Sequence, residues 1–281
     1  MILFKRSEDL RNWLDELKSR GSKIGFVPTM GALHEGHISL INSSRSQSDI
    51  TICSIFVNPA QFNNPDDFKK YPVSLENDIR MLEKAGTDIA FIPSVKEIYP
   101  QGDSGLETYV LGELETILEG RYRPGHFQGV CQVMSRLLRL VEPQHLFMGQ
   151  KDFQQCLVVK RLIHLLDLKV EFHLAPTQRE DSGLALSSRN RRLTTIQKLH
   201  ARSIFQTLIE IKQQLSIGDT GPLIEMTVKK LNESDFKTDY VSIARQDNLQ
   251  PVSSWDGRDQ IIALIAAFQG EVRLIDNMLL N

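Results

Sequence analysis

Residues 28–37 of this chain read PTMGALHEGH. This stretch follows a short apolar run at 24–27 and precedes a run with helical spacing at 38–41. This order predicts a strand, a glycine-bearing turn and then a helix. Backbone N–H groups at a helix N-terminus point toward a bound anion, and the helix dipole favours its charge. The stretch therefore predicts a place where phosphate can bind.

Two histidines frame a glycine in this turn. His34 and His37 are three residues apart at the expected helix start, so both rings should point the same way and can donate hydrogen bonds to phosphate oxygens. Gly31 and Gly36 allow close approach of the backbone because they carry no Cβ. The pattern favours a nucleotide-triphosphate site of the His-x-Gly-His kind. The alternative is a plain strand-to-helix connection with structural histidines.

Length and composition describe a globular protein. The chain has 281 residues, 41% of them hydrophobic and 24% charged, which is enough for two domains. Its net charge of −2 argues against a nucleic-acid partner, although a small anionic ligand needs only a few local cations. The three cysteines are widely spaced in apolar runs, which indicates buried thiols. We expect a cytoplasmic protein without a membrane partner, since no signal peptide and no apolar run of about 18 residues is present.

Strand-like and helix-like runs alternate through the first two thirds of the chain. The run at 50–57 is nearly continuous in apolar residues, as in a strand buried on both faces of a parallel sheet. The alternation predicts a Rossmann-like α/β fold, with a parallel sheet covered by helices on both faces. After about residue 190, two helical patterns and three strand-like runs predict a smaller C-terminal α+β domain. We place the domains at 1–176 and 177–281.

Four polar loops follow expected strands, at 29–37, 58–61, 149–152 and 177–189. Right-handed crossovers put the carboxyl ends of parallel strands at one edge of the sheet, where ligands bind in open α/β folds. We therefore expect the four loops to converge on one cleft.

Each loop offers groups suited to a small anionic ligand. Gln61 and Gln155 can donate and accept hydrogen bonds and would suit a small hydroxy acid, although an isolated glutamine is often only a solvent-facing amide. Lys151 stands at a helix start, where a cation often has an anionic partner such as nucleotide phosphate. Asp152 beside it could bind a ribose hydroxyl or act as a helix N-cap.

The last loop gathers hydroxyl groups and a guanidinium at Ser187, Ser188 and Arg189. These suit triphosphate oxygens and a leaving pyrophosphate, and the alternative is a serine-rich hinge. Arginines and a histidine at 121–126 either line the cleft or hold it shut. Because no metal ligands are clustered in the sequence, a metal would be Mg²⁺ carried on the nucleotide phosphates.

Six stretches together resemble one known family. They are PTMGALHEGH (28–37), VNPAQF (57–62), EGRYRPGHFQGV (119–130), FMGQKDFQQ (147–155), GLALSSRN (183–190) and RLIDN (273–277). In this order the chain resembles the pantoate–β-alanine ligases, which belong to the wider His-x-Gly-His nucleotidyltransferase group. The resemblance covers almost the whole chain.

The resemblance implies an ATP-dependent reaction in two steps. Pantoate would attack ATP to give pantoyl adenylate and pyrophosphate, and β-alanine would then displace AMP to give pantothenate. It also implies a homodimer whose C-terminal domain covers the site. The positions that match the family's catalytic residues are His34, His37, Lys151 and Arg189. Those that match its ATP-binding residues are Met30, Gly36, Gly149, Gln150, Lys151, Asp152, Gln178, Leu186, Ser187, Ser188 and Arg189. Those that match its pantoate-binding residues are Gln61 and Gln155.

Three positions depart from the family pattern, at Ser182, Gln150 and Gln178. None is a matched histidine, cation or pantoate-binding glutamine, so the resemblance still implies activity. Two other interpretations stay open. One is a nucleotidylyltransferase acting on a different small substrate, and the other is a non-catalytic ATP-binding module.

Overall fold

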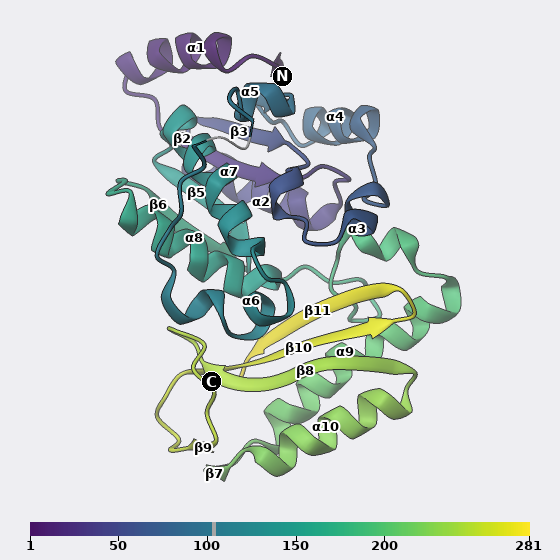
Figure 1. Ribbon diagram of the computed structural model, residues 1–281. Helices are drawn as coiled ribbons and strands as arrows, with labels where there is room; N and C mark the ends of the chain where they lie inside the picture. The colour runs from purple at the N-terminus through teal and green to yellow at the C-terminus, as the bar shows by residue number, and fades with distance from the viewer. Residues whose placement is uncertain (103–104) are drawn as a thin grey trace.

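A computed structural model describes residues 1–102 and 105–281. The N-terminal part is built on a six-stranded sheet in the order β1-β4-β3-β2-β5-β6, with every neighbouring pair parallel (Figure 1). Its strands are β1 (Ile2–Phe4), β2 (Ile24–Thr29), β3 (Ile50–Ile55), β4 (Ile89–Phe91), β5 (His145–Gly149) and β6 (Glu171–Ala175). The predicted parallel sheet is confirmed. Of the six strands in this sheet, the sequence pattern missed β1, an edge strand of three residues.

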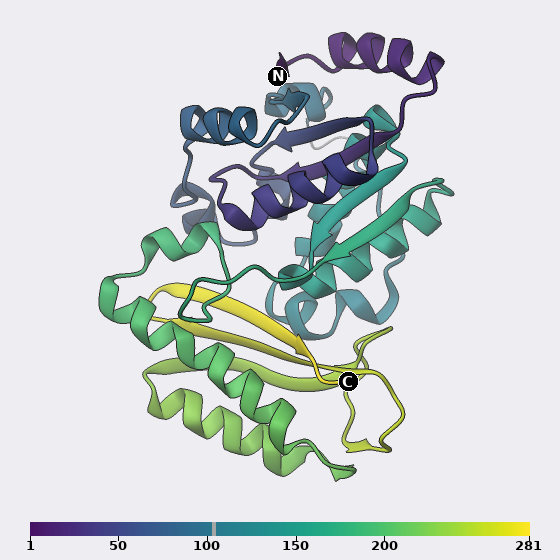
Figure 2. The same ribbon diagram turned by 180° about the vertical axis from the view of Figure 1, so that it is seen from behind.

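Helices cover both faces of this sheet, as predicted. One face packs against α1 (Ser7–Ser19), α7 (His126–Val141) and α8 (Phe153–Leu165), and the other against α2 (Glu35–Gln47) and α4 (Leu75–Lys84). Figure 2 shows α2 lying across the second face. In β2, Phe26 enters the first core and Val27 the second; in β3, Ile52 and Cys53 do the same. The continuous apolar runs are thus explained by burial on both sides.

The strand order creates a crevice beside β2. The chain leaves β2 through α2 and enters β3 on one side, whereas β5 pairs with β2 on the other side. A reversal of strand order leaves an opening at the carboxyl ends of the strands, where ligands bind in folds of this kind. The turn at 28–37 and the loop after Gly149 both border this opening. Shorter helices on the same part are α3 (Pro65–Lys69), α5 (Val95–Ile98) and α6 (Leu118–Tyr122).

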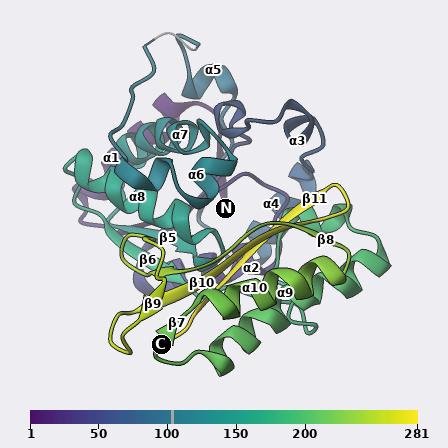
Figure 3. The ribbon, with the colours of Figure 1, turned by 60° about the horizontal axis from the view of Figure 1, so that its bottom comes forward.

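The C-terminal part holds an antiparallel sheet in the order β11-β10-β8. Its larger elements are α9 (Thr195–Gln214), α10 (Gly221–Glu233), β8 (Phe236–Arg245), β10 (Ile261–Gln269) and β11 (Val272–Leu279), with a small ribbon of β7 (Gly218–Asp219) and β9 (Ser254–Trp255). Figure 3 shows α9 and α10 running along one face of this sheet. The predicted order of two helices and three strands is confirmed.

The residues of β10 alternate between two cores. Ala263 and Ile265 pack toward α9 and α10, while Ile262 and Leu264 pack with Phe153 at the start of α8. The second contact seats the C-terminal sheet on the N-terminal part, next to the loop that follows β5. Within residues 1–102 and 105–281, no helix is long and apolar enough to cross a bilayer.

Candidate active site

The turn after β2 presents its two histidines through an unusual helix cap. His34 is the N-cap of α2, and its Nδ1 accepts the backbone N–H of Gly36 at 3.2 Å. The Nδ1 of His37 accepts the backbone N–H of His34 at 3.3 Å. Since a backbone N–H can only donate, both Nδ1 atoms must be unprotonated. Each neutral imidazole therefore carries its proton on Nε2 and can donate from that atom to a ligand.

Both imidazoles stay neutral at physiological pH. Burial lowers the pKa of His37 to about 4, helped by the positive charge of Lys151. Burial likewise lowers the pKa of His34 to about 3, with further contributions from His37 and Lys151. The ring centroids lie 4.1 Å apart, so the two rings face the same region as the sequence predicts. Neutral imidazoles of this kind can donate hydrogen bonds but carry no positive charge.

A buried carboxylate from a distant helix holds this turn. Asp78 of α4 accepts the backbone N–H groups of Ala32 at 2.8 Å and of Leu33 at 2.9 Å. Gly31 and Ala32 have φ values of 80° and 49°, a left-handed conformation that needs such support. The signal was an aspartate on the same helix face as Leu82, where an apolar residue is expected.

Gln61 is fixed by an equally buried network. The side chain of Asn58 donates to Gln61 Oε1 at 3.3 Å, and His126 contacts the backbone oxygen of Gln61 at 2.8 Å. Arg123 approaches His126 Nε2 at 3.0 Å; because arginine only donates, the His126 proton lies on Nδ1 and is donated to Gln61. Gly129 of α7 allows this packing, since a Cβ there would lie 2.1 Å from the oxygen of Ala60.

The loop after β5 carries the predicted cation. Lys151 Nζ lies 3.7 Å from the Asp152 carboxylate, and the side chain of Lys151 is 17% exposed. Asp152 occupies the N-cap position of α8 without a capping hydrogen bond from its side chain. Asn277 of β11 donates to the backbone oxygens of Gln150 and Lys151, both at 2.9 Å. The C-terminal sheet thus holds the backbone of this loop.

The loop at 177–189 contacts the histidine turn and α3. Ser188 donates its hydroxyl to the backbone oxygen of Ala32 at 2.9 Å, which joins this loop to the histidine turn. Arg189 forms two hydrogen bonds with Asp67 of α3, at 2.6 and 3.3 Å. Arg192 also contacts Asp67, at 2.9 Å. Asp67 therefore holds two arginines next to the site.

These loops enclose a cavity of about 210 Å³. The predicted site residues that line it are Met30, His34, Gly36, His37, Gln61, Gly149, Lys151, Asp152, Gln155, Gln178, Leu186, Ser187, Ser188 and Arg189. Gln150 is not among the residues lining this cavity, because its amide turns away and donates to Asn277 Oδ1 at 3.1 Å. Thr177 also lines the cavity. Its hydroxyl oxygen is buried and has no hydrogen-bond partner among the residues described. The expected convergence of the four loops is thus observed, while the roles of the residues stay predictions.

Known proteins share this architecture. The family model described as pantoate-beta-alanine ligase matches residues 2–279. The chain belongs to the pantoate–beta-alanine ligase family. It is 42% identical over 274 residues to a pantothenate synthetase of Bacteroides thetaiotaomicron, with 96% of both chains covered. It is 42% identical over 280 residues to a pantothenate synthetase of Azobacteroides pseudotrichonymphae, with 99% of both covered.

Two solved structures of the ligase family superpose on the whole chain. A pantothenate synthetase from Thermus thermophilus gives a TM-score of 0.88 at 36% identity, covering 100% of this chain and 99% of that one. A pantoate-beta-alanine ligase from Francisella tularensis, complexed with beta-gamma ATP and beta-alanine, gives 0.85 at 39% identity, covering 99% and 97%. The fold and family predicted from the sequence are therefore confirmed.

One wall of the cavity is apolar, which the sequence pattern alone does not reveal. Four residues of α7 line it at the helical spacing i, i+3, i+4 and i+7: Val130, Val133, Met134 and Leu137. Phe56, just after β3, also lines it. In the sequence this pattern is the same as that of a core helix. Only the position of α7 beside Gln61 shows that its apolar stripe borders the cavity.

The remaining family stretch, RLIDN, ties the two parts of the ligase together. Arg273 makes two hydrogen bonds of 2.8 Å to Glu119, which also accepts the Tyr240 hydroxyl at 2.9 Å. Burial alone would raise the pKa of Glu119, but the hydrogen bonds and charge of Arg273 lower it to about 2. Asp276 pairs with Arg179 in a bidentate contact. A second cleft, of about 510 Å³, lies between the two parts and shares Lys151 and Arg189 with the cavity.

Proposed function

We propose that this protein joins pantoate to β-alanine at the expense of ATP, forming pantothenate, AMP and pyrophosphate. A pantoate carboxylate oxygen bonds to the α-phosphorus of ATP and pyrophosphate leaves. The β-alanine amine then attacks the acyl carbon of pantoyl adenylate, and AMP leaves with the bonding electron pair. The observation that carries this proposal is the single cavity that combines two neutral imidazole donors, one lysine, paired glutamines and an apolar wall.

In the first step the protein supplies donors and positive charge. His34 and His37 donate from Nε2 to triphosphate oxygens, and Lys151 neutralises charge that develops as pyrophosphate departs. The Ser187 and Ser188 loop, together with Arg189, contacts the leaving group. Because the donors are half-buried and already oriented, they need little reorganisation when the reaction occurs. No covalent acyl-enzyme is needed, since the phosphate activates the carboxylate.

The apolar wall and the glutamines select the acid. Pantoate carries two hydroxyl groups on a carbon skeleton with a geminal pair of methyl groups. Gln61 and Gln155 are suited to its hydroxyl and carboxylate groups. Val130, Val133 and Met134 offer an apolar surface for the methyl groups, and burying each adds about 0.8 kcal/mol to binding. His126 acts as a positioning residue, because it holds the backbone of Gln61.

The C-terminal part shields the intermediate from water. We take residues 1–176 as the nucleotide- and pantoate-binding domain and residues 177–281 as the lid. Support comes from Asn277, which holds the Lys151 loop, and from Arg273, which binds Glu119 across the junction. An acyl adenylate hydrolyses readily, so closure by this domain favours transfer to β-alanine.

A Mg²⁺ ion would enter on the ATP phosphates. Asp152 is the one carboxylate among the described residues that line the cavity; the other polar groups there are mainly amides, hydroxyls, imidazoles and cations. Such a lining suits an ion that takes most of its ligands from phosphate oxygens and water. When bound, Mg²⁺ supplies charge neutralisation on the leaving pyrophosphate. We also propose a cytoplasmic homodimer, following the resemblance to the family.

Exchange of labelled pyrophosphate into ATP tests the function. With Mg²⁺ and pantoate we expect label in ATP, and with β-alanine added we expect pantothenate and AMP in equal amounts. A smaller hydroxy acid without the methyl pair is the matched control and should support little exchange. Exchange that does not need pantoate would favour a nucleotidylyltransferase acting on another substrate. ATP binding without exchange would favour a binding module. Light scattering of the purified protein reports whether it is a dimer.

A further inference from the structure

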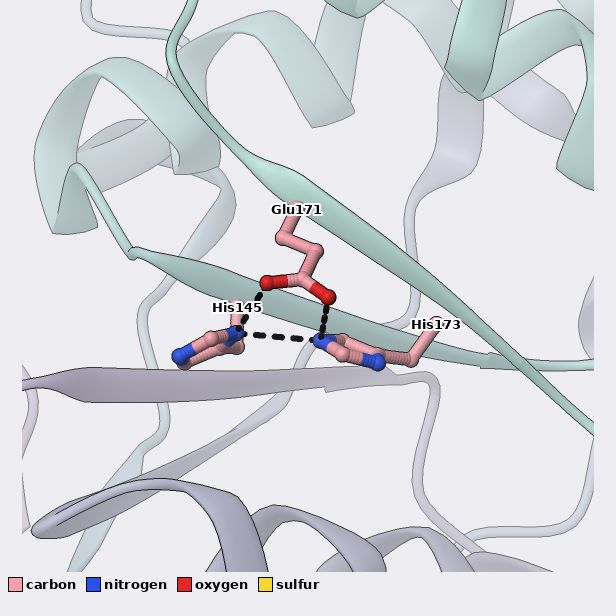
Figure 4. A group of neighbouring side chains, drawn as sticks. All are labelled: His145, Glu171 and His173. Atoms are coloured by element: carbon pink, nitrogen blue, oxygen red, sulfur yellow. Dashed lines mark hydrogen bonds and ion pairs between the residues drawn. The ribbon is translucent and has the colours of Figure 1, made fainter.

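Three side chains gather near the amino ends of β5 and β6, whereas the cavity lies at the carboxyl ends of the strands. His145 begins β5 and Glu171 begins β6, and the two are Cα partners in the parallel pair. His173 is two residues further along β6, so it projects from the same face as Glu171. Figure 4 shows the three side chains pointing toward one another from the two strands. Neither the family stretches nor the proposed reaction uses them.

Their ligand atoms have the spacing of a metal site. His145 Nδ1 lies 3.0 Å from His173 Nε2 and 3.4 Å from one Glu171 oxygen, while His173 Nε2 lies 3.8 Å from the other oxygen. A tetrahedral ion with bonds of about 2.0–2.2 Å requires ligand atoms roughly 3.3–3.6 Å apart. The ligand atoms of the three side chains thus lie close to this spacing, with a different Glu171 oxygen facing each histidine. Within residues 1–102 and 105–281, this is the one group of three such ligands within 4.8 Å of one another.

The two imidazoles are already held in place. The side chains of His145 and His173 are only 14% and 18% exposed. The ring of His173 stacks on Phe147, with centroids 4.5 Å apart and planes 11° apart. Glu171 is 66% exposed, so the site opens toward solvent on the carboxylate side. An ion can enter there and keep water in its remaining position.

The donor set selects the class of ion. Two imidazole nitrogens and one carboxylate suit Zn²⁺ and neighbouring transition-metal ions, whereas Mg²⁺ and Ca²⁺ prefer oxygen ligands. One of the two ring nitrogens carries the proton that they share at 3.0 Å. Because a ligating nitrogen must be unprotonated, metal binding moves this proton to the other nitrogen of its ring.

We propose that His145, Glu171 and His173 bind a divalent transition-metal ion of the zinc class across β5 and β6. The site is separate from the ligase cavity, because the four residue steps along β5 from His145 to Gly149 span about 13 Å. Since β6 is the edge strand of the sheet, an ion shared by both strands holds that edge in place. Binding to the folded state alone raises stability by mass action. The proposal does not depend on the ligase reaction.

Calorimetric titration of the full chain with Zn²⁺, in a buffer that does not bind the metal, tests the site. We expect one ion per chain. Changing a residue that only hydrogen-bonds to a metal ligand typically weakens metal binding about 10–100-fold. His173→Gln removes a ligand itself, so it should weaken Zn²⁺ binding by at least that factor. His164→Gln is the matched control, since His164 is an exposed histidine on α8. It should bind Zn²⁺ as the unchanged chain does. Equal binding by His173→Gln and the unchanged chain would overturn the proposal.

A second variant and a second readout guard against misfolding. Glu171→Gln changes an exposed side chain, so it should fold normally and still weaken Zn²⁺ binding by about tenfold or more. At the same zinc concentration, the midpoint of thermal unfolding should rise in the unchanged chain and in His164→Gln, and should rise less in Glu171→Gln. Pantoate-dependent exchange should be the same in all three. The site would be refuted if the unchanged chain bound no Zn²⁺ at a concentration about a hundredfold above a dissociation constant of about 1 μM. This holds whatever the exchange assay shows.

Discussion

Replacing Asp78 by asparagine tests whether the histidine turn depends on one buried carboxylate. Asp78 Oδ2 accepts the N–H of Ala32, and its Oδ1 accepts both the N–H of Leu33 and the hydroxyl of Ser74, the last at 2.9 Å. Asparagine has the same shape but only one oxygen. Its best placement keeps that oxygen facing Leu33 and Ser74, which turns the NH₂ group toward the N–H of Ala32.

The cost follows from this geometry. One buried backbone N–H loses its acceptor and meets another donor, which costs about 1–3 kcal/mol of unfolding free energy. Ala32 has a φ of 49° and loses the contact that supports this conformation. His34 and His37 follow directly in the chain, so their Nε2 atoms should shift. A displacement of about 1 Å in such donors can lower the adenylation rate by about a hundredfold.

Urea unfolding and pantoate-dependent exchange measure the two effects. Asp15→Asn, on an exposed position of α1, is the matched control and should change the unfolding free energy by less than about 0.5 kcal/mol. For Asp78→Asn we expect both a lower unfolding free energy and slower adenylation. If Asp78→Asn unfolded like the control and exchanged label at the normal rate, the turn would not need this carboxylate.

Four further results are expected. His37→Ala and Lys151→Ala should each slow adenylation about a hundredfold or more in single-turnover experiments, and a near-normal rate would remove that side chain from the transition state. Gln61→Ala or Gln155→Ala should mainly raise the KM for pantoate, and an unchanged KM would place the residue outside the acid pocket. Gly149 has a φ of −84° and open space where a Cβ would lie. Gly149→Leu should therefore keep its Tm yet raise the KM for ATP about tenfold or more, whereas a lower Tm would contradict this. The pKa of His37 is about 4 when folded and 6.5 when unfolded, so the unfolded chain binds more protons between these values. Stability should be complete above pH 6.5 and fall as the pH drops toward 4. His37→Gln should flatten that slope, and an unchanged slope in urea unfolding would show that His37 is not buried.

The sequence predicted those features that depend on local pattern. The apolar runs of β2 and β3 predicted strands buried on both faces, and the alternation of strand and helix then placed four loops at one edge. From that placement alone, Gln61, Lys151 and Arg189 could be expected in one cleft. Local spacing is enough for this, because right-handed crossovers leave few ways to arrange parallel strands.

The sequence could not predict the residues that support the site from a distance. Asp78 is about 45 positions from the backbone groups it binds, and Asn277 is more than 120 positions from Lys151. In the sequence, only its place on the same helix face as Leu82 distinguishes Asp78 from a surface aspartate, and nothing indicates which backbone groups it binds. Asn277 resembles any polar residue in a strand. Only the tertiary structure reveals that each serves as the hydrogen-bond partner of a distant loop.

The sequence also does not show which side chains of the cavity carry positive charge, and this charge decides how ATP phosphates can bind. The histidines are neutral, so the positive charge of the cavity resides on Lys151 and Arg189. Arg189 is already paired with Asp67, whose pKa is lowered because the hydrogen bonds and charges of Arg189 and Arg192 outweigh its burial. A triphosphate that binds Arg189 must therefore compete with a charged carboxylate. Removing the partner of a half-buried carboxylate is normally costly. Arg192 lies 2.9 Å from Asp67 and can keep it paired, so Arg189 can turn to phosphate without leaving an isolated charge.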